Sequence, residues 1–77
     1  MGAFNIRKDM GCEARQSTEH IAIDPRADGK PGIDIHFKEG TKGETCHIPV
    51  IISQTGMNDM VYNDFYVADD CDVTIVA

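Results

Sequence analysis

The amino-acid sequence predicts an all-β protein made of short strands. Apolar residues alternate with polar ones along most of the chain, which is the two-residue period of a strand. Polar turns rich in Gly, Pro and Asp separate these segments, and no stretch keeps a helical period over a useful length. A chain of 77 residues is expected to form one small domain, spanning residues 1–77.

The first two strands are predicted to form a hairpin. Phe4 and Ile6 alternate with polar residues up to Asp9, and Gly11 suits the left-handed position of a short hairpin loop. Residues 12–16 then return as a strand, with one helical turn over 13–16 as the alternative.

The next pair of strands flanks a Gly- and Pro-rich loop at residues 28–32. The strand before the loop begins with Ile21 and Ile23, and Asp24-Pro25 ends it, because proline has no N–H to donate to a ladder. The strand after the loop has one apolar and one polar face. Its apolar face holds Ile33, Ile35 and Phe37, and its polar face holds Asp34 and His36.

A further strand follows the polar turn at residues 38–44. Pro49 interrupts it, which places the strand at a sheet edge, at a bulge or in a short coil. A turn at 54–59 leads to a strand at 61–67, and an acidic corner at 68–72 closes that strand. The apolar face of the Pro49 strand consists of Cys46, Ile48, Val50 and Ile52.

The spacing of these strands narrows the architecture. From Ile48 onward, strand centres recur about every 10 to 15 residues, which is typical of a sandwich and of a right-handed β-helix. We expect N-terminal strands over about 1–37 that lead into the first coil of a right-handed β-helix over about 45–77. A small antiparallel sandwich is the alternative. The side chains expected to point inward or to stack between coils are Ile48, Val50, Ile52, Val61, Phe65, Val67, Val73 and Ile75.

The chain ends in its most strand-like run, Val73, Thr74, Ile75, Val76 and Ala77, which no turn, charge or Gly closes. We expect this run to be an open interaction edge, because a coil of a solenoid exposes its last strand until the next coil covers it. In this interpretation the chain is the opening portion of a longer protein. The isolated chain is predicted to self-associate through the edge.

Charge and composition limit the classes of binding partner expected for the chain and indicate its location. The formal net charge is −6, so nucleic acid and anionic membrane surfaces are not expected as partners. The sequence has no apolar run long enough for a signal peptide or a membrane span, which predicts a cytoplasmic protein. Its 3 cysteines lie far apart without a CxxC pair, as expected for reduced thiols.

Four side chains, Cys46, His47, His36 and Cys71, are candidate metal ligands. Neighbouring residues of a strand point to opposite faces, so Cys46 is expected in the core and His47 at the surface. His36 and His47 could lie side by side on neighbouring strands, but the sequence offers no third ligand. The acidic run at 69–72 lacks the Gly and Glu of an EF-hand loop. The sequence therefore predicts no metal site, no cofactor site, no catalytic residue and no enzymatic activity.

The stretch CHIPVIISQTGMNDMVYNDFYVADDCDVTIVA, Cys46 to Ala77, resembles the SufB/SufD family, the scaffold proteins of SUF iron–sulfur cluster assembly. It is most similar to the shorter SufB/SufD-like members. The motifs that carry the resemblance are His47-Ile48-Pro49-Val50, Val61-Tyr62-Asn63-Asp64-Phe65-Tyr66-Val67 and Asp72-Val73-Thr74-Ile75-Val76-Ala77. Asn5-Ile6-Arg7 and Pro31-Gly32-Ile33-Asp34-Ile35 are similar with less specificity.

The resemblance implies a right-handed parallel β-helix, a helical segment that docks an ABC-type ATPase subunit, and pairing with a second SufB/SufD-like chain. The family's cluster-building Cys, His and Glu residues lie beyond the position that matches Ala77, so no ligand or catalytic residue is transferred. The expected function is that of the N-terminal part of a scaffold, with a structural and interaction role. An iron–sulfur cluster is implied for the whole system. The alternative is a free-standing small metal-binding or β-interaction module.

Overall fold

The computed structural model describes residues 2–9, 11–51 and 61–77, and within these ranges the regular structure is all strand, as predicted. The strands are β1 (Ala3–Lys8), β2 (Gly11–Gln16), β3 (Ile21–Pro25), β4 (Gly32–Phe37), β5 (Lys42–His47), β6 (Val50–Ile51), β7 (Tyr62–Val67) and β8 (Asp72–Val76). The described residues contain no helix with the length and apolar character needed to cross a membrane.

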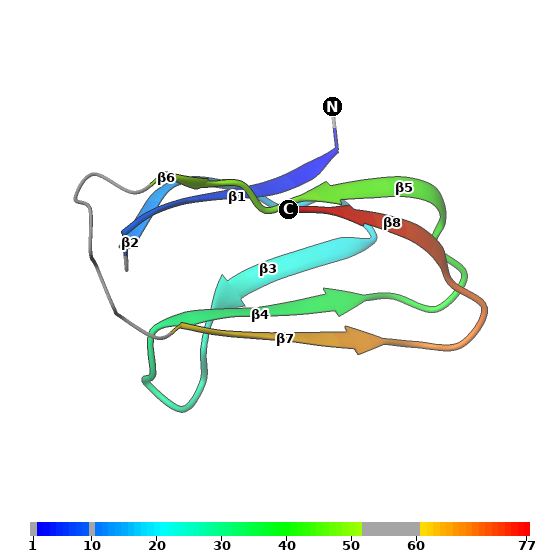
Figure 1. Cartoon of the computed structure of the whole chain (residues 1–77). Helices are drawn as coiled ribbons and strands as arrows, with labels where there is room; N and C mark the ends of the chain where they lie inside the picture. The colour runs from blue at the N-terminus through cyan, green and yellow to red at the C-terminus, as the bar shows by residue number, and fades with distance from the viewer. Residues whose placement is uncertain (1, 10, 52–60) are drawn as a thin grey trace.

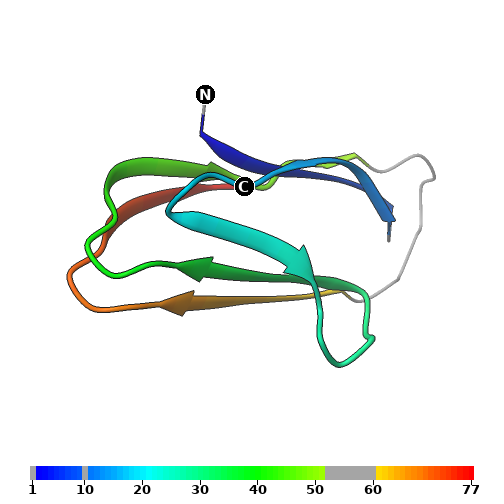
Figure 2. The same ribbon diagram turned by 180° about the vertical axis from the view of Figure 1, so that it is seen from behind.

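The strands form two layers, which face each other in Figures 1 and 2. Sheet A has the strand order β2-β1-β5-β8, with β6 also paired to β1, and sheet B has the order β3-β4-β7. The turn after β4 takes the chain from sheet B to sheet A, and the turn after β7 does the same. The β4–β5 turn and the β7–β8 turn therefore both lead from sheet B to sheet A.

Both sheets are mixed. The pairs β1/β2 and β3/β4 are antiparallel, whereas β1/β5, β1/β6, β5/β8 and β4/β7 are parallel. The predicted hairpin at the N-terminus is confirmed, and the helical-turn alternative for residues 13–16 is wrong. The alternative of a small antiparallel sandwich is also wrong, because four ladders among the described residues run parallel.

The parallel ladders repeat one offset in sequence. In sheet B, Gly32 faces Tyr62 and Phe37 faces Val67, with no irregularity between them. In sheet A, Lys42 faces Asp72 with the same offset, and the register then shifts by one residue at Gly43. Gly43 has a φ of 65°, a conformation that glycine adopts without steric cost and that suits such an irregularity. In sequence order, β7 thus pairs with β4 and β8 pairs with β5.

The core lies between the sheets and is centred on β3 and β4. The predicted apolar face of β4 is confirmed: Ile33, Ile35 and Phe37 are buried. Alternate residues of β3, Ile21 and Ile23, join them in the core. Among the described residues of sheet A, the fully buried apolar side chains are small, those of Ala3 and Cys46, and Val73 packs partly buried against the core.

The face of β1 that is buried is not the face that carries its large apolar residues. Ala3 and Asn5 are buried between the sheets, and Arg7 follows them on the same face. Phe4 and Ile6 lie on the other face and are half-buried. The alternation is that of a strand, but its polar side chains point inward.

Pro49 interrupts the strand as expected. β5 ends at His47, and the chain resumes pairing only at the short β6. The carbonyl of Pro49 accepts a hydrogen bond from the Arg7 amide at 3.0 Å, so the break is still held to β1. The predicted turn at 54–59 and Ile52 lie outside the described residues.

The predicted set of inward-facing side chains needs correction. Ile48 and Val73 pack partly buried against the core, and Val61 is half-buried. The remaining described members, in contrast, are exposed: Val50, Phe65, Val67 and Ile75. The physical reason for the exposure of Phe65, Val67 and Ile75 is that, among the described strands, β7 and β8 each have a neighbour on one side only.

Candidate interaction edge

The candidate site is the open edge formed by β7 and β8, which we call the terminal rung. β8 is the last strand of sheet A and β7 the last strand of sheet B, and the turn at residues 68–71 joins them. Within the described ranges, no strand pairs with the outer side of either one. Each strand therefore presents backbone N–H and C=O groups that a further strand could pair with.

The predicted edge at 73–77 forms most of β8. Thr74, Ile75 and Val76 face Thr45, Cys46 and His47 of β5, which satisfies the inner side of the strand. The Val76 carbonyl accepts a hydrogen bond from the Ile48 amide at 2.8 Å, and Ala77 follows the end of the strand. Of these residues, Ile75 and Val76 are the large apolar side chains that remain exposed.

The sequence interpretation missed the contribution of β7 to this edge. Phe65 and Val67 face Ile35 and Phe37 of the buried strand β4, so they continue the core face outward. The rings of Phe37 and Phe65 stack at 6.4 Å between centroids, yet Val67 keeps 55% of its surface exposed. Apolar surface that lies in register with a core and remains uncovered is typical of a site that receives another chain segment.

Aromatic side chains also stack between β4 and β7 on the outer face of sheet B. His36 and Tyr66 are register partners whose rings stack with 4.5 Å between centroids and 9° between planes. The Asp34 carboxylate, together with partial burial and Asp64, raises the pKa of Tyr66 above its ordinary value. Side chains on both faces of β7 thus stack directly on those of β4.

The opposite edges of the two sheets are protected. β2 ends sheet A with the polar sequence GCEARQ, whose Glu13 is exposed. β3 ends sheet B and finishes in Asp24 and Pro25, which are also exposed. Charged side chains and proline are the common means by which proteins block an edge strand from pairing. The molecule therefore has one blocked end and one open apolar end.

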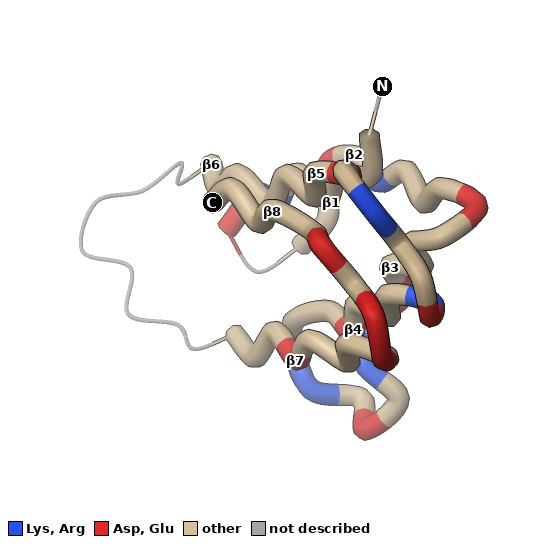
Figure 3. Tube along the Cα trace, turned by 90° about the vertical axis from the view of Figure 1, so that its right-hand side faces the viewer, with Lys and Arg blue, Asp and Glu red and all other residues tan. Residues whose placement is uncertain are grey.

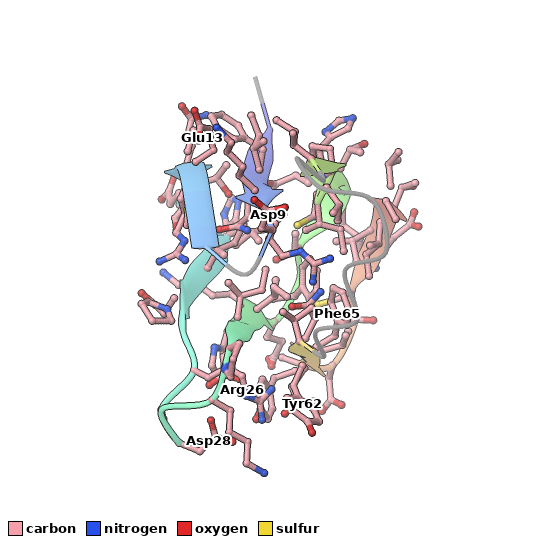
Figure 4. The ribbon with its side chains drawn as sticks, turned by 60° about the vertical axis from the view of Figure 1, so that its left-hand side comes forward. Asp9, Glu13, Arg26, Asp28, Tyr62 and Phe65 are labelled. Atoms are coloured by element: carbon pink, nitrogen blue, oxygen red, sulfur yellow. The ribbon has the colours of Figure 1, made fainter. Side chains whose placement is uncertain are left out.

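Arg26 holds the open end in place and was not predicted to do so. Its guanidinium binds Asp28 through two contacts of 3.1 and 2.9 Å, and Nη1 lies 3.0 Å from Asp64 Oδ2. The same nitrogen donates to the Tyr62 carbonyl at 3.2 Å and lies 3.7 Å from Asp34. Its side chain is only 11% exposed, and Figure 4 shows it close to Asp28 and Tyr62. Arg26 thereby links the β3–β4 loop to β7.

The acidic turn that joins β7 to β8 stands out in Figure 3. Asp70 adopts a φ of 62°, and the Asp69 carbonyl accepts a hydrogen bond from the Gly40 amide at 3.1 Å. The Cys71 thiol donates to the Lys38 carbonyl at 3.0 Å. These contacts fasten the turn after β7 to the turn after β4, so the two turns lie one above the other.

The four candidate metal ligands do not converge. Cys46 is buried in sheet A and His47 beside it is exposed, as the alternation of a strand predicts. The expectation that His36 and His47 lie on neighbouring strands is wrong, because the turn after β4 places them in different sheets. Cys71 lies in the turn before β8. Among the residues that the structure describes, no group of three or more His, Cys, Asp or Glu side chains is arranged to hold a metal ion.

Comparisons with protein-family models, with curated proteins and with solved structures give no match for this chain.

Proposed function

We propose that this chain supplies the first coil of a SufB/SufD-like scaffold in iron–sulfur cluster assembly. Its role there is structural: it starts a right-handed β-helix and presents the terminal rung for the next coil or for another chain. The motifs from Cys46 to Ala77 support the proposed family. The coil is supported by the sequence offset that the β4/β7 and β5/β8 ladders share at their first residue pairs. The whole scaffold would work with an ABC-type ATPase subunit and a second SufB/SufD-like chain, in the cytoplasm.

The observation that carries this proposal is the difference between the two ends of the molecule. At the β2 and β3 end, polar residues and proline block strand addition. At the terminal rung, Val67 and Ile75 keep 55% and 41% of their surface exposed, although both strands lie in register with the core. A closed domain would bury these side chains, whereas a coil that accepts a neighbour needs them exposed.

The proposal predicts that the chain self-associates through the terminal rung. At tens of micromolar, light scattering should give a mass above that of the monomer. Ile75→Lys adds a charge to the open strand and should shift the distribution to monomer. Ala27→Lys adds the same charge in the exposed β3–β4 loop and should leave the association unchanged. A monodisperse monomer for the unsubstituted chain at this concentration would contradict the proposal.

The separation of the candidate ligands disfavours a free-standing metal-binding module. Elemental analysis of chain purified without chelator separates the two functions. A scaffold coil should carry no stoichiometric zinc or iron. One bound metal per chain that is lost in Cys46→Ala would instead establish the module.

A further inference from the structure

The inward-pointing polar residues of β1 line a cavity between the sheets, at the end of the molecule near the β1–β2 hairpin. The cavity has a volume of about 70 Å³. Its polar lining comes from Asn5, Arg7, Arg15 and Asn63, and its apolar lining includes Ile33 and Ile48. Among its described lining residues, Asn63 of β7 belongs to the terminal rung and none belongs to β8.

Strand geometry explains why two arginines meet there. Asn5 and Arg7 lie on the same face of β1 because they are two residues apart. Asn5 faces Arg15 of β2 in the antiparallel ladder, and the irregularity between Ile6 and Arg7 brings Cys12 opposite Arg7. The hairpin thus directs both guanidinium side chains to one cavity, and Asn63 reaches it from β7.

The polar groups of this cavity are only partly satisfied. Arg15 Nε donates to Asn5 Oδ1 at 2.8 Å, and Asn5 is 4% exposed. Arg7 Nε is buried and has no hydrogen-bond partner among the described residues. No Asp or Glu is among the described lining residues. A chain with a net charge of −6 nevertheless places two arginines around one small space whose described lining holds no carboxylate.

Such an arrangement is costly without a ligand. A buried donor without an acceptor is destabilising, and two positive charges that share a cavity repel each other. A small anion with several acceptor oxygens would relieve both effects, since guanidinium groups bind oxyanions through paired charge-assisted hydrogen bonds. A cavity of this volume has room for a small ligand and not for a large one.

We propose that this cavity is a binding site for a small oxyanion, held by Arg7 and Arg15 with Asn5 and Asn63 as neutral donors. The chemistry suits a free tetrahedral anion such as phosphate or the carboxylate group of a larger molecule. The acidic surface of the chain disfavours loose anion binding elsewhere, so specific binding should be measurable against a low background.

The test is titration of the full chain with inorganic phosphate, against sodium chloride at equal ionic strength. The readout is the NMR resonances of the Arg7 and Arg15 Nε–H groups and of the Asn5 and Asn63 side-chain amides. Saturable shifts of these resonances, with a rise in melting temperature, are expected for phosphate. A parallel titration with acetate distinguishes the two sources. A response to acetate alone identifies a carboxylate site, and a response to phosphate alone identifies a site for a free tetrahedral anion.

Two variants localise the effect. Arg7→Gln should weaken phosphate binding by at least about tenfold, because it removes one charged fork. Lys8→Gln removes the same charge from an exposed neighbour and should change the affinity by less than about twofold. Absence of saturable shifts for both anions in the unsubstituted chain would overturn the proposal, and this outcome does not depend on the folding of any variant. An equal loss of affinity in both variants would also overturn it. Because Ile75 is not among the described residues that line the cavity, either result can be told apart from the outcome of the self-association test.

Discussion

The Arg26 guanidinium, which follows β3, lies 3.0 Å from the Asp64 carboxylate of β7, although β4 separates these two strands in sheet B. One side chain therefore spans the sheet from its blocked edge to its open edge. It also binds Asp28 in its own loop. The position of the open strand β7 depends on a residue that lies outside every strand.

Arg26→Gln should lower the melting temperature clearly, because it leaves Asp34 and Asp64 without their shared cation. Arg26→Lys should recover little of the loss, since an ammonium group cannot reproduce the fork that binds a carboxylate through two nitrogens. Lys42→Gln is the matched control: its ion pair with Asp70, at 4.0 Å, is exposed and should contribute little. Thermal unfolding followed by circular dichroism measures all three. Equal shifts for Arg26→Gln and Lys42→Gln would contradict the spanning role.

Gly32 sets the close approach of β4 and β7. Its φ is 128°, and a Cβ at this position would overlap with the backbone carbonyl oxygen of Tyr62. Gly32→Ala should destabilise the fold by on the order of 3 kcal/mol, because the substitution strains the backbone and separates the two strands. Gly29→Ala is the control, with a φ of 78° but open space around the added carbon, and should cost about 1 kcal/mol. Urea unfolding compares the two, and equal losses would mean that the strand contact is unimportant.

The stability of the chain should fall in acid through Asp28. The Arg26 guanidinium, with help from the Lys30 amide, lowers the pKa of Asp28 from 3.8 to about 2. The ionised form is therefore favoured in the folded state. Its contribution is fully present above the ordinary pKa of 3.8 and is lost as the pH falls through about 2.

Urea midpoints of the unsubstituted chain and of Asp28→Asn, measured from neutral pH down to pH 2, test this dependence. The difference between the two should be constant at neutral pH and should shrink as the solution is acidified below 3.8. A difference that grows in acid would contradict the assigned ion pair.

The thiols of Cys12 and Cys46 should differ in reactivity. Burial raises the pKa of the Cys46 thiol and shields it, whereas Cys12 is exposed. An aromatic disulfide reagent should modify Cys12 rapidly and Cys46 only when the chain unfolds. Cys12→Ser should remove the fast phase without altering the slow one. Rapid modification of Cys46 in the folded chain would mean that sheet A does not cover it as described.

The sequence predicted most strands because their alternation is dictated locally. Ile33, Ile35 and Phe37 were correctly assigned to one buried face, since polar residues separate them and Pro31 marks the start of the strand. The same rule fails on β1. Its neighbours make Asn5 and Arg7 the inward-facing residues, and no local pattern shows which face of a strand meets the opposite sheet.

Only part of the interaction edge was predicted, because the rest depends on which strands become neighbours. The run at 73–77 is recognisable as an edge from its composition, but β7 is not, because Phe65 and Val67 were expected to point inward or to stack between coils. The role of Arg26 depends on Asp64, which is remote in sequence and becomes a neighbour only when β7 lies on β4. Contacts created by strand order of this kind have no signature in a single sequence.

The unequal ends of the molecule also limit how far self-association can proceed. Two copies that meet through their terminal rungs would be related by a twofold axis, and their β8 strands would then run antiparallel to each other. Each copy would turn its blocked β2 and β3 end away from the contact, where no third copy finds an apolar strand to extend. Association would therefore stop at a dimer, since a fibre needs two different, complementary interfaces on every subunit.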